Sequence, residues 1–198
     1  MCCLISRSIF AVVVTLLSLL SCERRTARAD LFPIDRVLDA QIQFLSASDA
    51  QLHKEALIGQ TRDESTYVPA GTAMWETEFE ILRRLNEINK PVNSSNYVVE
   101  DGLPDPASNL TVKSFTARTS MPVRYFKVFY QESISKPRKI EALYDEKNLL
   151  LKSGRKIAME FEQIGSEHVL TSYAVDGGQR VILGDTVAFA IRAKIFIR

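Results

Sequence analysis

The chain has 198 residues, of which 46% are hydrophobic and 25% are charged, and its formal net charge at pH 7 is +1. That length supports one well-buried domain and leaves little chain for a second. Because 25 lysines and arginines are balanced by 24 acidic residues, the composition lacks the basic excess that marks nucleic-acid-binding proteins. No nucleic-acid partner is expected.

The first 21 residues have the pattern of a secretory signal peptide. Arg7 is the single charge among the first eight residues, and residues 9–20 are apolar apart from Thr15 and Ser18. A positively charged start followed by a short apolar run is typical of a secretory leader. A spanning helix needs about 20 apolar residues. Residues 1–21 are therefore expected to be a cleaved leader rather than a transmembrane helix.

The leader ends in the run Leu19-Leu20-Ser21-Cys22. This run resembles the lipobox of bacterial lipoproteins, which has an aliphatic residue three positions before the cysteine and a small residue just before it. The resemblance implies cleavage before Cys22, a diacylglyceryl thioether on its sulfur, and a membrane anchor for the mature chain. Two acyl chains suffice for stable anchoring, because each buried methylene contributes about 0.8 kcal/mol.

Residues 22–31 are polar and arginine-rich, which indicates a flexible tether between the lipid and a single domain over residues 32–198. Glu23 stands where an aspartate would indicate retention in the inner membrane. The resemblance therefore implies an outer-membrane anchor that faces the periplasm. All three cysteines lie within the first 22 residues, so the domain is expected to have no disulfide and no cysteine metal ligand.

Two amphipathic helices are predicted at the start of the domain. Residues 33–45 have apolar side chains at helical spacing after Pro33, which suits a first helical position. Residues 72–89 have a second apolar stripe, formed by Trp75, Phe79, Leu82 and Leu85. Between the two helices, residues 51–68 read as a hairpin that turns at Gly59 or as a continued helix, and the β-prone residues after that glycine favour the hairpin slightly.

From residue 109 onward the chain is β-rich. Strands are predicted at 111–117, 123–131, 139–145, 155–162, 168–175, 180–183 and 187–197. The short links, including Ser153-Gly154 and Asp176-Gly177-Gly178, read as hairpin turns, so successive strands are expected to pair antiparallel. The predicted fold is α+β: an antiparallel meander of about six to eight strands with the two helices packed on one face. Residues 187–197 are the candidate edge strand, because they end the chain.

Residues suited to catalysis or metal binding are sparse in the domain. His53 and His168 have no His, Asp or Glu neighbours at metal-ligand spacing. Ser166, Glu167 and His168 fall in or beside one predicted hairpin and lack the glycine pattern of a nucleophile elbow. We therefore expect neither enzymatic activity nor a cofactor.

The expected function is a non-enzymatic binding or assembly role in the cell envelope. The overall pattern is similar to uncharacterised envelope lipoproteins of Gram-negative bacteria, a resemblance that transfers no function. One hypothesis is an assembly module that offers its sheet or an edge strand to an envelope protein. An alternative is a lipid or lipoprotein carrier, since a curved antiparallel sheet closed by helices resembles the half-barrel of lipoprotein-localisation factors. An apolar cavity or a packed core would then contain Trp75, Phe79, Phe126 and Phe129. An envelope hydrolase is the third and weakest hypothesis.

Overall fold

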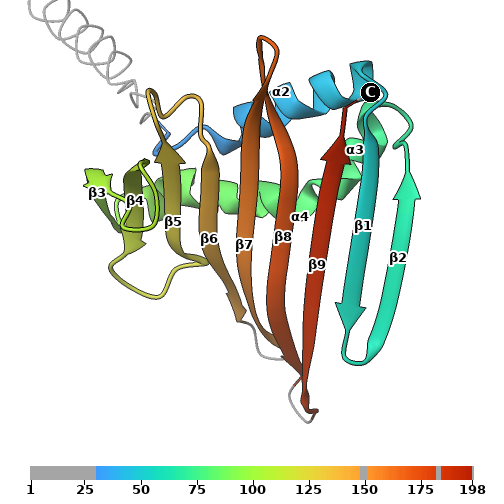
Figure 1. Cartoon of the computed structure of the whole chain (residues 1–198). Helices are drawn as coiled ribbons and strands as arrows, with labels where there is room; N and C mark the ends of the chain where they lie inside the picture. The colour runs from blue at the N-terminus through green and yellow to red at the C-terminus, as the bar shows by residue number, and fades with distance from the viewer. Residues whose placement is uncertain (1–29, 148–150, 182–183, 198) are drawn as a thin grey trace, which may run out of the picture.

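The computed structural model describes residues 30–147, 151–181 and 184–197, and side chains at all of these except 151 and 181. The expected leader, Cys22 and most of the expected tether lie outside the described residues. The described chain forms one open antiparallel sheet with a layer of helices on one of its faces (Figure 1). In this part of the chain, no helix is both long and apolar enough to cross a membrane.

The described residues form five helical segments and nine strands. The helical segments are α2 (Ile34–Ala47), α3 (Gly71–Glu78), α4 (Glu80–Arg83), the 3₁₀ helix η1 (Arg84–Asn89) and α5 (Pro91–Ser94). The strands are β1 (Gln51–Ile58), β2 (Thr61–Tyr67), β3 (Tyr97–Pro104), β4 (Thr111–Ala117), β5 (Val123–Tyr130), β6 (Lys139–Lys147), β7 (Leu151–Ile164), β8 (Glu167–Val181) and β9 (Thr186–Phe196).

The strand order is β2-β1-β9-β8-β7-β6-β5-β4-β3, and all neighbours pair antiparallel. Strands β4 to β9 form the expected meander, β3 extends it at one end, and β1 and β2 form the hairpin favoured for residues 51–68. The structure has nine strands rather than six to eight, because β3 and the hairpin join the same sheet. The prediction that residues 187–197 form an edge strand was wrong. Strand β1 pairs along β9 from Gln51 to Ile58, so the edges are β2 and β3.

The prediction of a turn at Asp176-Gly177-Gly178 was also wrong, since these residues lie inside β8. A Cβ atom on Gly177 would lie 2.6 Å from Cζ of Phe189 and 2.5 Å from the carbonyl oxygen of Gly154. The glycine is therefore needed for close approach of an aromatic ring and of β7, rather than for a change of chain direction. Gly154 likewise lies within a strand, β7.

The first predicted helix corresponds to α2, but the second is broken. The chain leaves α-helical geometry at Phe79, which has φ −90° and ψ 4°, and it continues as α4 and then as η1. The apolar stripe predicted for this segment still faces the sheet, and its four members, Trp75, Phe79, Leu82 and Leu85, are fully buried.

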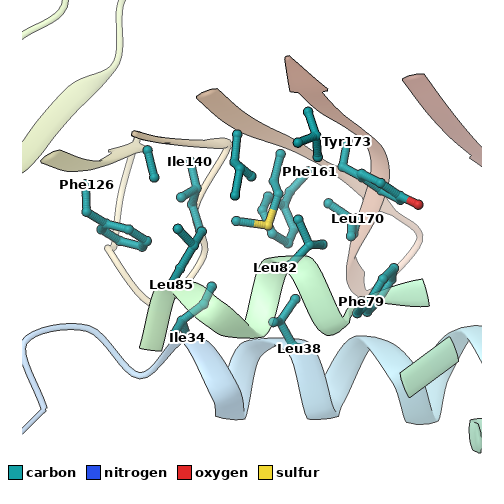
Figure 2. Close-up of a cluster of buried hydrophobic side chains, with 14 of the residues drawn as sticks. Ile34, Leu38, Phe79, Leu82, Leu85, Phe126, Ile140, Phe161, Leu170 and Tyr173 are labelled. Carbon is teal, nitrogen blue, oxygen red and sulfur yellow. The ribbon is translucent and has the colours of Figure 1, made fainter. Parts of the chain in front are cut away.

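The core lies between the helical layer and the concave face of the sheet. Figure 2 shows Leu82 and Leu85 pointing from the helical layer toward the sheet, with Ile34 and Leu38 of α2 completing the cluster. All four side chains are fully buried. Burying each such side chain contributes about 1.5–3 kcal/mol, so this interface holds the helices on the sheet.

One buried polar side chain also ties α2 to β8. The pairing of β8 with β9 begins at Ser172, so residues 167–171 of β8 have no β9 partner. The Gln41 Nε2 atom donates to the carbonyl of His168 at 2.8 Å, and its Oε1 atom accepts from the backbone N–H of Leu170 at 2.7 Å. The Gln41 amide thus makes the hydrogen bonds that a neighbouring strand would make, and it satisfies backbone groups that would be costly to bury unpaired.

Replacing this glutamine should destabilise the fold. We expect Gln41→Leu to lower the free energy of unfolding by about 1–3 kcal/mol, because the backbone N–H of Leu170 loses its acceptor in a buried position. Chemical denaturation measures the change. Gln43→Leu, at an exposed position of the same helix, is the control and should change stability by less than about 0.5 kcal/mol. Equal losses in the two variants would contradict this account of Gln41.

Candidate functional site

The long strands of the sheet extend beyond the helical layer. Strands β7, β8 and β9 continue below α3 and α4 (Figure 1). Their registers place Arg155, Gly177, Phe189 and Ile58 in one row across β7, β8, β9 and β1. Residues opposite one another in register point to the same face of a sheet. Val175 lies two residues from Gly177 on β8, and Ala193 lies four residues from Phe189 on β9, so both point to the same face as the row. Because Val175 and Ala193 are buried in the core, the row belongs to the concave face.

A pocket of about 640 Å³ lies where the helical layer ends. Its polar lining consists of Lys54, Thr77, Glu78, Glu80, Arg84, Arg155, Gln179 and Asp185. Its apolar lining consists of Ile58, Ile81, Val175, Val187, Phe189 and Ile191. Pockets that bind small molecules have volumes of about 300–1,000 Å³ and mostly apolar walls with a few polar groups. This pocket matches that description in size, and its lining combines a continuous apolar surface with more polar side chains than is usual.

The pocket is closed at its inner end and open at its mouth. Val175, beside the core, is 1% exposed, whereas Val187 and Ile58 are 47% and 59% exposed. Large apolar side chains are thus left exposed on the concave face, where a bound apolar group would cover them.

A carboxylate with three donors forms the wall nearest α3. Glu78 accepts hydrogen bonds from Lys54 Nζ at 2.6 Å, from Tyr67 Oη at 3.3 Å and from Tyr173 Oη. Its side chain is only 10% exposed. Burial, followed by the Glu78 charge, raises the pKa of Tyr173 and that of Tyr67, so both phenols remain protonated donors. The cluster links α3 to β1, β2 and β8 and sets where the helical layer ends.

A different polar group lies on the β7 side. Arg155 is 15% exposed, and its guanidinium lies 5.9 Å from the centre of the Tyr144 ring. Its Nη1 atom lies 3.6 Å from Oε2 of Glu146, beyond hydrogen-bond range, and the same oxygen accepts from Arg84 at 3.3 Å. Two guanidinium groups therefore share one carboxylate, and Arg155 is the less well paired of the two.

Two polar atoms on this part of β7 have unfilled hydrogen-bonding capacity. Ser153 Oγ and Arg155 Nη1 are buried and have no hydrogen-bond partner among the described residues. The two residues are two positions apart on one strand, so both side chains lie on the concave face. Buried polar atoms in folded proteins almost always have a partner, so each exception needs an explanation, such as a bound water or ion.

The aromatic residues considered for a cavity lie elsewhere. Trp75 and Phe79 pack together in the core with ring centres 5.5 Å apart, and Phe126 packs against Phe32 at 5.4 Å. Phe129 lies on the opposite face of β5, where Lys139 Nζ is 5.4 Å from its ring centre. The structure thus brings Trp75 and Phe79 together and separates Phe129 from the other three.

Sequence reasoning did not select Arg155, Ser153 or Lys54. The one sequence pattern that indicates part of the pocket is the alternation along residues 187–197. It places the side chains of Val187, Phe189 and Ile191 on one face of the strand. That pattern identifies an apolar face but does not reveal that the helices leave part of it uncovered.

The residues considered for catalysis have local structural partners. His168 shares a hydrogen bond with the carbonyl of Pro137, and its ring stacks on Phe161 with centres 5.5 Å apart. Ser166 donates to Glu167 at 3.3 Å. Within the described ranges, no group of three or more His, Cys, Asp and Glu side chains forms a potential metal site.

Comparisons of the chain with protein-family models, with curated proteins and with solved structures give no match.

The floor of the pocket depends on a glycine. We expect Gly177→Ala to lower the free energy of unfolding by about 1–3 kcal/mol, because its methyl group would overlap both the Phe189 ring and a backbone oxygen. Gly178→Ala is the control, since the nearest atom to its Cβ would be a flexible side-chain methyl, Cγ2 of Thr186, at 3.2 Å. Thermal or chemical denaturation compares them. A Gly177→Ala variant as stable as Gly178→Ala would show that the close packing of Phe189 is not required.

Proposed function

We propose that this protein is a non-enzymatic binding protein that holds the apolar chain of a single amphiphilic molecule in the pocket between α3–α4 and strands β8, β9 and β1. The observation that carries the proposal is the uncovered apolar end of the concave face. There Val187 and Ile58 remain about half exposed beside a pocket of about 640 Å³. Covering such surface contributes about 25 cal/mol per Å².

The arrangement of the pocket favours an amphiphile over a wholly apolar ligand. The inner end is apolar at Val175 and Ile191, whereas Arg84, Arg155 and Gln179 contribute polar groups to the lining. A molecule with one apolar chain and one polar end can satisfy both kinds of surface at once. Fixing the orientation of a ligand is the usual role of a few polar groups in a mostly apolar site.

The rival hypothesis of an assembly module that offers an edge strand has less support. The two edges of the sheet are β2 and β3. Strand β2 has charged residues at Arg62, Asp63 and Glu64, and β3 ends at Pro104 after an irregular register between Glu100 and Leu103. Charges, prolines and irregularities on an edge discourage the addition of another strand.

We further propose that an acylated Cys22 anchors the domain to the envelope, with the outer membrane and the periplasm as its address. The support is the signal-type segment and the lipobox-like run that ends at Cys22. Residues 23–29, between that cysteine and the start of the described chain at Asp30, would keep the domain within a short distance of the bilayer. A membrane-bound position suits a protein whose ligand is an amphiphile.

Blocking the pocket should weaken binding. We expect Val187→Trp to weaken the binding of dodecanol or dodecanoate at least tenfold, because the indole would occupy the pocket mouth on β9. Isothermal titration calorimetry with the purified full chain measures the affinities. Ala188→Trp, on the opposite face of the same strand and also exposed, is the matched control and should bind as the unmodified protein does. If the unmodified protein binds no single-chain amphiphile, the proposed function is wrong.

Removing the acceptor sulfur tests the anchor. We expect Cys22→Ser to eliminate the incorporation of labelled fatty acid and to move the protein from the membrane fraction to the aqueous fraction, because a serine hydroxyl does not become the lipid thioether. Metabolic labelling and membrane fractionation measure the two effects. Cys3→Ser, inside the expected leader, is the control and should leave both unchanged. Membrane partitioning that persists in Cys22→Ser would refute the lipid anchor.

A further inference from the structure

The pocket contains a polar end with a definite chemical preference. Resting on the proposed function, we propose that its ligand is a long-chain carboxylic acid whose carboxylate is bound by Arg155, which lines the pocket, with Ser153, which is buried next to the lining on the same face of β7, as a second donor. The chain of the acid lies over Phe189, Val187 and Ile58.

The unfilled hydrogen-bonding groups support a ligand headgroup at this place. Arg155 Nη1 is a buried donor with no partner within the described chain, and Ser153 Oγ, on the same face of β7, has none either. A carboxylate oxygen accepts from both kinds of group. Hydrogen bonds that involve a charged partner are about twice as strong as neutral ones, so an anion gains more at this place than an alcohol or an amide.

The charges around the pocket leave Arg155 available. Lys54 is engaged with Glu78 at 2.6 Å, in a cluster that two tyrosines complete. Arg84 lies between Glu146 at 3.3 Å and Glu80 at 3.6 Å. Arg155 has a carboxylate only at 3.6 Å, without a hydrogen bond.

The same surroundings favour a carboxylate over a phosphate. Glu146 lies close to Arg155, and the carboxylates of Glu80 and Asp185 line the pocket. A phosphate monoester has a charge of about −1.5 to −2 at neutral pH, so it would be repelled by these groups more strongly than a singly charged carboxylate. The planar fork of an arginine also matches a carboxylate in geometry.

The row of residues across the sheet provides a track for the chain. Gly177 stands between Arg155 and Phe189 in register and has no side chain, and the Phe189 ring lies over it. Strands are about 4.8 Å apart, so Phe189 and Ile58 lie about 10 and 14 Å from Arg155 along this row. A flexible chain that starts at Arg155 therefore meets apolar surface within one strand spacing.

Three ligands that share a dodecyl chain and differ in the headgroup test the assignment: dodecanoate, dodecanol and dodecyl phosphate. Each is titrated into the full-length protein at pH 8, and isothermal titration calorimetry measures its affinity. We expect dodecanoate to bind at least tenfold more tightly than dodecanol. Arg155→Gln should reduce that ratio to twofold or less and leave dodecanol binding unchanged. Ser153→Ala should weaken dodecanoate binding about two- to fivefold. Lys156→Gln, on the exposed opposite face of β7, is the matched control and should keep the full ratio.

The outcomes that overturn the assignment are distinct. Equal binding of dodecanoate and dodecanol by the unmodified protein, or an unchanged ratio in Arg155→Gln, would refute carboxylate recognition and leave the proposed function standing. Tighter binding of dodecyl phosphate than of dodecanoate would replace the carboxylate with a phosphate. Binding of none of the three would refute the proposed function itself. The ratio of dodecanoate to dodecanol affinity is measured in the unmodified protein, so the test remains decisive if Arg155→Gln fails to fold.

Discussion

The helical layer is narrower than the strands that it crosses, and the candidate site follows from that mismatch. Two helices side by side, each about 10 Å wide, cover about 20 Å of strand length, whereas the 15 residues of β8 extend for about 50 Å. The helices run across the strands (Figure 1), so part of the concave face has no helix over it. The alternation of side chains continues into that part and leaves apolar residues such as Phe189 and Val187 without a covering helix.

Buried polar side chains determine where the covered part ends. Gln41 ties α2 to the backbone of β8 at residues that are not paired with β9, and Glu78 ties α3 to the side chains of three strands. Both interactions are directional, unlike the apolar packing around them, so they set the position of the helices along the strands. Moving either helix toward the pocket would break these hydrogen bonds and leave polar groups buried without partners, at about 1–3 kcal/mol each.

The chemistry of the pocket depends on register. Arg155, Gly177 and Phe189 are far apart in the chain but adjacent in the sheet, because β7, β8 and β9 pair antiparallel with few irregularities there. A shift of one residue in either pairing would turn the shifted side chains to the other face. The guanidinium, the bare glycine and the aromatic ring form one surface only in this register.

The sequence by itself determined most of the elements. Helical spacing in residues 33–45 and alternation in residues such as 155–162 and 187–197 are local patterns, and the structure has a helix or a strand at each. Sequence alone did not show that β1 pairs with β9 or that Gly177 lies inside a strand, because both depend on contacts between distant segments. For the same reason it pointed to Trp75 and Phe79, which fill the core, and not to Arg155 or Ser153. Only the tertiary structure decided which part of the apolar face the helices cover and which part stays open, since that depends on the position of the helical layer on the sheet.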